Sequence, residues 1–274
     1  MRTNKFKEIV TSTDDDTKTY LYKFLASLEL KNGTKQNAAS WKTALETLVH
    51  KKTSQEKIYT HIRDICKQEN SFNNIQRAKT LAKRITNELK YYRPYKRYNS
   101  LLDIGCATGA ITTELMQELK IPASRAYGTD VDDYPITKFN FIKITQNTET
   151  FDAIKTASID LITCSMSLHH IVNIEQTLNE LCRVISPSGI LIIREHDCKT
   201  PMFAYYLDIV HGLYELSLGE KIAHNFLKEY EAYYKSKQEW RQLITNAGFK
   251  FVYQTPPLPN MRAYYSVYTK HVAK

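Results

Sequence analysis

The stretch LLDIGCATGAITTELM, residues 101 to 116, places two of the chain's eight glycines four residues apart, directly after a short apolar run. The run 101–104 has the composition of a buried strand, and the segment after Gly109 has the apolar spacing of a helix. Glycine lets the backbone of such a turn approach a ligand, and the first N–H groups of a helix have no partners within the helix. The stretch therefore predicts a strand, a ligand-binding turn from Gly105 to Gly109, and a helix.

Short apolar runs alternate with amphipathic segments from residue 96 onward. The runs are SLLDIG, RAYGTDV, FNFIKIT, IDLITCS, GILIIRE, FKFVYQT and AYYSVYTK. Strands that alternate with helices predict an α/β fold with a doubly wound sheet. Only a loop, PPLPNMR, separates the last two runs, so we expect these two strands to pair as an antiparallel hairpin.

Residues 1–95 have a different, helical pattern. Apolar residues recur at helical spacing in TYLYKFLASLELK, AASWKTALETLVHKK, SQEKIYTHIRDICKQ and NNIQRAKTLAKRITNELKYY. We therefore expect a small basic helical region over 1–95 and an α/β domain over 96–274. Within the α/β domain, the long aromatic stretch 200–235 is expected to form a helical lid over the substrate site.

The net charge of +9 is unevenly distributed. Residues 1–100 carry a net charge of +11, whereas residues 101–274 carry −2. From Arg77 to Arg97, eight basic residues accompany one acid, Glu88, and tyrosines interleave with the basic end. Cations that contact phosphates and rings that stack on bases are what an RNA-binding segment requires.

The same basic segment has a second interpretation, which the sequence favours equally. It can be an amphipathic helix that packs Ile75, Leu81 and Ile85 on the sheet and leaves its cations in solvent. In that case the positive charge is a solvated surface with no bound partner.

Asp130 ends the second apolar run, 25 residues after Gly105. An acidic side chain at this position of a nucleotide-binding sheet can accept hydrogen bonds from both hydroxyls of a ribose. The spacing D-x-G-x-x-x-G differs from the dinucleotide motif G-x-G-x-x-G and forms a wider turn with no demand for a pyrophosphate. Turn and acid together predict a ligand that contains a nucleoside.

These motifs resemble those of the class I S-adenosylmethionine-dependent methyltransferases. LLDIGCATG is similar to the first motif of that family, AYGTDVDD to the second, and IDLITCSMSLHHI with LNELCRVISPSGILIIREHD to its fourth and fifth strands. EWRQLITNAGFKFV is similar to its final helix and sixth strand. The resemblance covers about 96–274. It implies a Rossmann-like seven-stranded sheet with an antiparallel last strand, and S-adenosylmethionine as cofactor.

The resemblance also implies a cofactor site at the ends of four strands. Its residues are Asp103, Gly105, Cys106, Ala107 and Gly109 around the amino acid end, Asp130 at the ribose, Val131 on the adenine, Gln146 and Asn147 at the adenine edge, and Ser165 and Met166 near the transferable methyl group. Many members of the family carry Asp where this chain has Gln146 and Asn147.

Three side chains are candidates for acid–base catalysis. His169 and His170 follow the fourth run and Glu195 ends the fifth, so all three belong to the edge of the sheet that holds the cofactor. Methyl transfer from a sulfonium is an in-line displacement in which positioning does much of the work, but an oxygen acceptor also needs a base. Imidazole titrates near neutrality and suits that role. The alternative is that the LHHI step only begins the next helix.

Two absences narrow the acceptor. No Asn/Asp-Pro-Pro-aromatic tetrapeptide follows the fourth run, which argues against N6 methyltransferases of exocyclic amines, and the Lys-Asp-Lys-Glu set of ribose 2′-O enzymes is not evident. The CSMSLHH step is as similar to cap guanine-N7 enzymes as to small-molecule enzymes. We therefore expect a methyltransferase whose charge favours an RNA acceptor. The alternatives are a small-molecule O- or N-methyltransferase and a catalytically silent scaffold that binds S-adenosylmethionine.

The five cysteines lack C-x-x-C spacing, and no other ligand cluster indicates a metal. No apolar stretch approaches the roughly 18 residues that span a bilayer, and the first residues have no secretory apolar region. We expect reduced thiols, no bound metal and no membrane contact, in a cytoplasmic protein.

Overall fold

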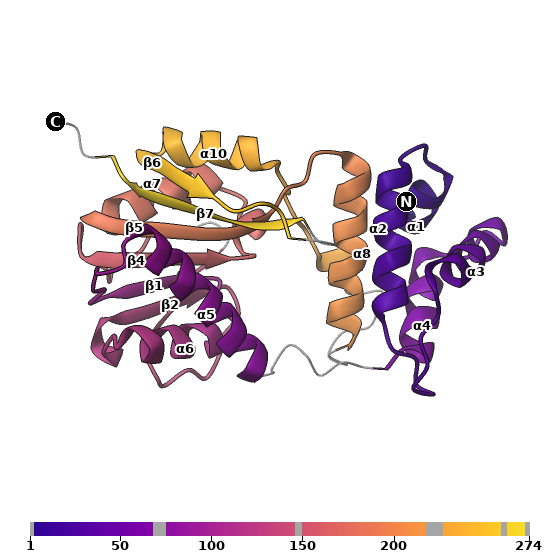
Figure 1. Cartoon of the computed structure of the whole chain (residues 1–274), viewed down its shortest axis with the longest axis horizontal. Coiled ribbons are helices and arrows are strands. Elements are labelled where there is room, and N and C mark those ends of the chain that lie inside the picture. Colours follow the sequence, from indigo (N-terminus) through magenta and orange to yellow (C-terminus); the bar gives the residue numbers. More distant parts are fainter. Residues whose placement is uncertain (1–2, 68–74, 146–149, 218–226, 259–261, 272–274) are drawn as a thin grey trace. The chain divides into compact units, whose positions relative to one another are not determined.

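The computed structural model describes residues 3–67, 75–145, 150–217, 227–258 and 262–271, and the chain divides into two compact units (Figure 1). An α/β unit comprises residues 73–197, 235–257 and 263–274. A helical unit comprises residues 1–72, 198–234 and 258–262. The chain therefore passes from one unit to the other five times.

The α/β unit is built on a seven-stranded sheet with the order β3-β2-β1-β4-β5-β7-β6. The strands are β1 (Leu101–Ile104), β2 (Ala126–Asp130), β3 (Asn140–Lys143), β4 (Ile159–Ser165), β5 (Ile185–His196), β6 (Phe249–Gln254) and β7 (Ala263–Lys270). The first five strands are parallel, and β7 is antiparallel to both β5 and β6. The expected fold class, the seven-stranded sheet and the C-terminal hairpin are confirmed.

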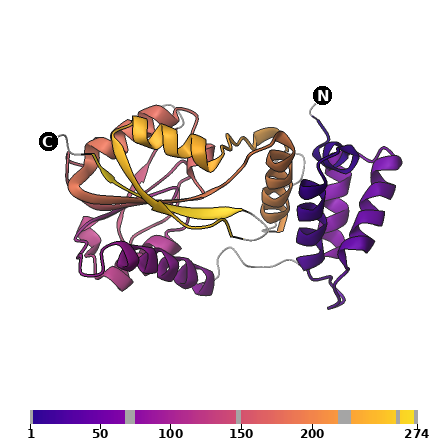
Figure 2. The same cartoon turned by 45° about the horizontal axis from the view of Figure 1, so that its top comes forward.

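Helices cover both faces of this sheet (Figure 2). On one face lie α5 (Ile75–Tyr92) and α6 (Ala110–Leu119), and on the other lie α7 (Ile174–Val184) and α10 (Lys237–Asn246). Successive residues of β5 point to opposite faces, as strand geometry requires. Ile190 and Ile192 accordingly pack in the core under α5, whereas Leu191 and Ile193 pack in the core under α7 and α10.

The boundary between the units falls at residues 72 and 73, whereas the sequence suggested 95 and 96. The reason is α5, whose buried residues Leu81, Ile85 and Leu89 form an apolar stripe, and the last two pack with strand residues of the α/β unit. Ile85 thus packs with the strands as expected for an amphipathic helix, and Leu81 is buried. Ile75 does not, because it begins the helix and its side chain is 65% exposed.

The helical unit has a core of its own. It contains α1 (Lys5–Thr11), α2 (Asp15–Ser27), α3 (Ala38–His50), α4 (Gln55–Ile65) and α8 (Pro201–Ser217). Tyr206 of α8 is fully buried beside Phe24 of α2. Asp208 of α8 forms an ion pair with Lys5, in which Nζ lies 2.6 Å from Oδ2. The stretch 200–235 is therefore helical where α8 lies, as expected, and shares a core with the N-terminal helices. Its role as a lid stays a prediction.

Membrane spans were sought over the described residues. None of their helices combines the length and the hydropathy that crossing a bilayer demands.

The packing of α5 on the sheet leads to a stability prediction. Ile85→Ala removes a side chain that is 2% exposed and should lower the free energy of unfolding by about 2 to 5 kcal/mol, because a cavity is left beneath the helix. Ile75→Ala on the same helix is the matched control, with a change within about 0.5 kcal/mol. Urea unfolding followed by circular dichroism measures both. Equal losses would show that α5 does not pack as described.

Candidate active site

The turn after β1 depends on its two glycines. Gly105 has φ +68° and Gly109 has φ +71°, the left-handed backbone conformation that residues other than glycine rarely adopt. A Cβ atom on Gly105 would lie 2.5 Å from Cβ of Ser167, and one on Gly109 would lie 2.7 Å from Cζ of Phe139. Both positions therefore exclude a side chain on two independent grounds, conformation and space.

Asp130 joins this turn to the end of β2. Its Oδ2 accepts a hydrogen bond from the backbone N–H of Ala107 at 2.8 Å, and its Oδ1 accepts one from the N–H of Asp132 at 3.2 Å. The bond to Ala107 supports an alanine whose φ is +46°. Each carboxylate oxygen can accept more than one hydrogen bond, so Asp130 can still accept hydrogen bonds from ribose hydroxyls.

The neighbours of Asp130 place the remaining predicted residues of this part of the site. Cys106 is buried, and its N–H donates to the carbonyl of Thr129 at 2.9 Å, so it contributes backbone to the turn and keeps its thiol inside. Val131 is 45% exposed, an apolar side chain held in solvent directly after Asp130. A flat apolar ring bound there would cover it.

Asp103 lies beneath the turn, not on its surface. Its side chain is buried, Oδ2 accepts from Thr112 Oγ1 at 2.5 Å, and Oδ1 accepts from Thr163 Oγ1 at 2.7 Å. Burial raises the pKa of this carboxyl to about 6, although both hydroxyls act in the opposite direction. The carboxyl thus connects β1 with α6 and β4, and direct contact with the cofactor stays a prediction.

The exit of β4 lies beside the glycine turn because β4 is the neighbour of β1. Met166 there has φ +61°, and its N–H donates to the carbonyl of Arg194 at 2.8 Å. This bend brings Ser167 against Gly105 and leaves Ser165 and Met166 partly exposed at the edge of the sheet. Gln146 and Asn147 lie outside the described residues.

His169 and Glu195 form a buried pair at the ends of β4 and β5. Nδ1 of His169 lies 2.7 Å from Oε2 of Glu195, and Oε1 of Glu195 accepts from the N–H of Leu168 at 2.9 Å. Both side chains are inaccessible to solvent. Burial raises the pKa of Glu195 to about 7, and burial, helped by the nearby His170, lowers the pKa of His169 well below its usual value.

His170 differs from His169 in its access to solvent. The two residues belong to the short 3-10 helix η2 (Leu168–His170), and their ring centroids are 4.3 Å apart. Whereas His169 is buried, His170 is exposed. The buried pair His169–Glu195 thus supports the accessible imidazole of His170. Of these three side chains, only that of His170 can contact a dissolved molecule without rearrangement.

The turn and its surroundings fit S-adenosylmethionine. The N-cap of α6 is Gly109, which makes no side-chain cap, so the first N–H groups of the helix remain available to a carboxylate. Asp130 offers acceptors for a ribose, and Val131 offers an exposed apolar surface for a base.

Several residues that shape the site were not found from the sequence. They are Thr112 and Thr163, which hold Asp103, and Ser167 and Phe139, which pack on the glycines. Thr163 is the register partner of Asp103 on the neighbouring strand, and no motif in the sequence specifies that register. Phe139 begins the apolar run FNFIKIT and lies just before β3, but nothing in that run indicates that its ring packs on Gly109.

A hollow of about 390 Å³ lies beside the start of α6. Thr108, Ala110 and Thr113 line it together with the loop 134–138 and the first turn of α5. Gly105, Asp130 and Val131 are not among its lining residues, so we do not assign it to the cofactor.

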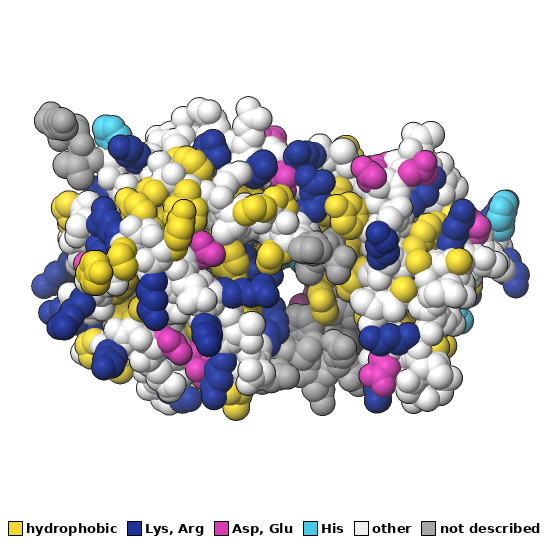
Figure 3. All heavy atoms as spheres, viewed as in Figure 1, with side chains coloured by type: hydrophobic (Ala, Val, Ile, Leu, Met, Phe, Trp, Pro, Cys, Tyr) yellow, Lys and Arg dark blue, Asp and Glu magenta, His cyan; other side chains and the backbone are white. Residues whose placement is uncertain are grey.

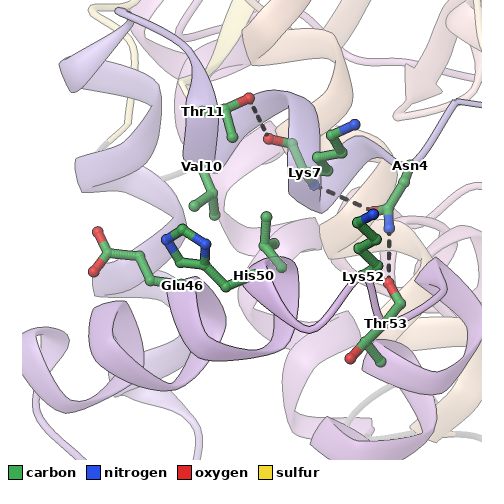
Figure 4. A pocket seen from close by; sticks show the side chains of 9 residues that line it. Asn4, Lys7, Val10, Thr11, Glu46, His50, Lys52 and Thr53 are labelled. Carbon is green, nitrogen blue, oxygen red and sulfur yellow. Dashed lines mark hydrogen bonds between the residues drawn. The ribbon is translucent and has the colours of Figure 1, made fainter.

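A hollow of about 620 Å³ lies in the helical unit between α1 and α3 (Figure 4). Asn4 donates from Nδ2 to the carbonyl of Thr53 at 3.1 Å and accepts at Oδ1 from the N–H of Lys7 at 3.2 Å. His50 and Glu46 of α3 line the same hollow. The hydrogen bonds of Asn4 join α1 to the loop after α3, which is a structural role.

The comparison with known families decides the assignment. A family described as "Methyltransferase domain" matches residues 73–254, which begin with α5 and end with β6. The chain belongs to this methyltransferase family. Membership of this family agrees with the cofactor, S-adenosylmethionine, and the class of reaction, methyl transfer, that the sequence resemblance implied.

Individual relatives cover part of the chain. The ubiquinone biosynthesis O-methyltransferase of Rickettsia canadensis (strain McKiel) is 31% identical over 153 residues, which are 55% of this chain and 62% of that protein. The ubiquinone/menaquinone biosynthesis C-methyltransferase UbiE of Rickettsia massiliae (strain Mtu5) is 28% identical over 119 residues, 41% of this chain and 48% of that protein. The chain thus matches about half to three fifths of the length of these relatives.

Among solved structures, a Burkholderia thailandensis 1,6-didemethyltoxoflavin-N1-methyltransferase aligns with a TM-score of 0.49 and 13% identity. The alignment covers 86% of this chain and 89% of that chain. That structure contains 1,6-didemethyltoxoflavin and S-adenosylhomocysteine.

The close contact between Gly105 and Ser167 leads to a prediction with an internal control. Gly105→Ala should lower the free energy of unfolding by about 3 kcal/mol, because it combines left-handed strain with a clash. Gly33→Ala shares the positive φ, +80°, but a Cβ there meets nothing within 4 Å, so about 1 kcal/mol is expected. Urea unfolding gives both values. Losses of equal size would contradict the contact with Ser167.

The buried Asp103 carboxyl predicts a pH dependence of stability. Because its pKa rises from 3.8 to about 6 on folding, the folded state holds a proton that the unfolded state loses. The contribution of this carboxyl to the free energy of unfolding, about 3 kcal/mol, is therefore complete below pH 3.8 and is lost as the pH rises through 6. Asp103→Asn should flatten the curve of unfolding free energy between pH 4 and 6, measured by urea unfolding at each pH. An unchanged slope would contradict the burial of the charge.

Proposed function

We propose that this protein transfers the methyl group of S-adenosylmethionine to an oxygen atom of a small-molecule acceptor. The observation that carries the proposal is the group His169, His170 and Glu195 at the edge of the sheet where β4 and β5 end. An oxygen acceptor must lose a proton when it is methylated, and an accessible imidazole beside a fixed pair is suited to accept it. The bound cofactor supplies a methyl group on a sulfonium, which needs no further activation.

The chain's own residues have separate roles in this proposal. Glu195 positions His169 through the 2.7 Å contact, and the buried His169 in turn supports His170. His170 accepts the proton of the acceptor hydroxyl through a ring nitrogen while the new carbon–oxygen bond forms. Ser165 and Met166 line the wall of the site next to the methyl group. Asp130 and the glycine turn hold the ribose and the amino acid end of the cofactor.

A small acceptor has more support than the RNA that the charge favoured. The relatives above are named for the biosynthesis of ubiquinone and menaquinone, which are small molecules. Within the basic segment, Arg93 Nη1 donates to the carbonyl of Ser188 at 3.3 Å, and Lys96 Nζ donates to the same carbonyl. These two cations thus have a partner inside the protein. The exposed cations of α5 are the observation that keeps RNA as the second candidate.

Cofactor binding is the first test. Asp130→Ala should weaken the binding of S-adenosylhomocysteine at least about tenfold in isothermal titration calorimetry, because the ribose acceptor is removed and the turn loses its bond to β2. Asp132→Ala, whose exposed side chain is two residues away, is the control and should leave affinity within about twofold. If the folded wild type binds neither the cofactor nor its demethylated product, the assignment of this site is wrong.

The acceptor class is tested with tritiated S-adenosylmethionine offered to a metabolite extract and to total RNA. Label in the small-molecule fraction is expected, and His170→Gln should lower its rate by about a hundredfold, as for the loss of a general base. His61→Gln, an exposed histidine of α4, is the control. Label in RNA alone would overturn the proposal. No label in either fraction, with cofactor binding intact, would favour the scaffold alternative.

A further inference from the structure

Arg194 lies on the face of β5 opposite to Glu195. Successive residues of a strand point to opposite faces, and Glu195 points to His169. Arg194 therefore points to the face covered by α5 and α6, where Ile192 and Tyr265 are also buried. Arg194 and Tyr265 are register partners on the antiparallel strands β5 and β7, so their side chains lie side by side.

One polar atom of each side chain in this pair is buried without a partner. Nε of Arg194 and Oη of Tyr265 are both inaccessible, and neither has a hydrogen-bond partner among the described residues. No carboxylate of the described residues forms an ion pair with Arg194 either. The Arg194 side chain as a whole is partly exposed, but buried donors without acceptors, such as its Nε, are rare in folded proteins. The arrangement is therefore one that an anion would complete.

The surroundings of Arg194 add positive charge. Arg77 and Arg84 on the exposed side of α5 are close enough to lower the pKa of Arg194, together with its burial, which is the larger effect. Glu88 of the same helix accepts a hydrogen bond from Tyr253 Oη at 2.8 Å. In Figure 3, Lys and Arg side chains are prominent over the part of the surface that α5 occupies in Figure 1.

The position of Arg194 relates it to the acceptor side of the site. Arg194 pairs with Ser165 of β4, and its carbonyl accepts the hydrogen bond from Met166 at the β4 exit. β5 is two strands from β1, so its backbone lies about 10 Å from that of the strand that carries the glycine turn. The first N–H groups of α6 would hold the carboxylate of the cofactor. An anion at Arg194 therefore belongs to a second molecule.

We propose that Arg194 and Tyr265 bind a carboxylate or phosphate group of the methyl acceptor. The guanidinium offers paired N–H donors that match either group, and the phenol adds a third donor. Arg77 and Arg84 attract the anion to the site. This inference rests on the proposed function and narrows its substrate class to small anionic acceptors.

The test uses benzoate and inorganic phosphate as anionic probes and benzyl alcohol as the neutral counterpart of benzoate. Each is titrated into the full chain saturated with S-adenosylhomocysteine and into the chain alone. The wild type should bind benzoate or phosphate and not benzyl alcohol. Arg194→Gln should lower the affinity for the anionic probes at least about tenfold. Arg194→Lys should lower that affinity less, because the charge is kept. Arg125→Gln, an exposed arginine of η1 (Ala123–Arg125), is the control.

Three outcomes would overturn the inference. Binding of neither anion by the wild type would do so, as would equal binding to Arg194→Gln. A tenfold loss of S-adenosylhomocysteine affinity in Arg194→Gln would assign the arginine to the cofactor's carboxylate instead. Should Arg194→Gln fail to fold, Tyr265→Phe keeps the ring and removes only Oη, and it must still weaken the anionic probes. Failure of the wild type to bind S-adenosylhomocysteine would instead count against the proposed function.

Discussion

The buried carboxyl of Asp103 is the interaction on which the geometry of the site depends. It accepts one hydrogen bond from a hydroxyl of α6 and one from a hydroxyl of β4, so a single side chain connects β1, α6 and β4. The start of α6 fixes Gly109, and the end of β4 fixes Ser167 against Gly105. The turn between these points is then positioned for Asp130 to accept the N–H of Ala107. Removing the two hydroxyls would leave a buried acid without partners, which is why they are as much a part of the site as the glycines.

Strand β5 brings two opposite electrostatic environments to one end of the sheet. Glu195 points to the face of α7 and α10, where it meets an imidazole, and Arg194 points to the face of α5 and α6, where it meets a phenol. The alternation of a strand separates these groups although they are adjacent in the chain. Proton transfer and anion recognition can therefore be served by neighbouring residues without the formation of a salt bridge between them.

Much of this architecture was predictable because it follows from local periodicity. The apolar runs are short and separated by helical patterns, so all seven became strands, and IDLITCS and AYYSVYTK did so with the bounds of the runs themselves. The glycine turn and Asp130 were predictable because chemistry restricts which residues can occupy them. Periodicity does not show which helices and strands become neighbours in space. The amphipathic pattern of α5 offered packing on the sheet as one of two interpretations, and only the structure shows that Ala82, Ile85 and Leu89 pack with strand residues.

The same limit applies to single side chains. Asp103 was expected at the cofactor because of its place in the motif, yet only the three-dimensional register shows Thr163 opposite it. Arg194 and Tyr265 are 71 residues apart in the chain, and their proximity follows from an antiparallel pairing whose register no motif specifies. A buried pair of donors without acceptors becomes visible only after that register is known.

The way in which the chain is divided between the two units has a consequence for how the protein can be dissected. The helical unit takes its core from the beginning of the chain and from α8, which follows β5, so no single cut separates the units. A fragment that starts at residue 96 would lose the helix that covers one face of the sheet, and a fragment that ends before residue 198 would leave α1 to α4 without α8. Exchange of either unit between related proteins therefore has to respect several junctions at once, and the two units are constrained to be inherited together.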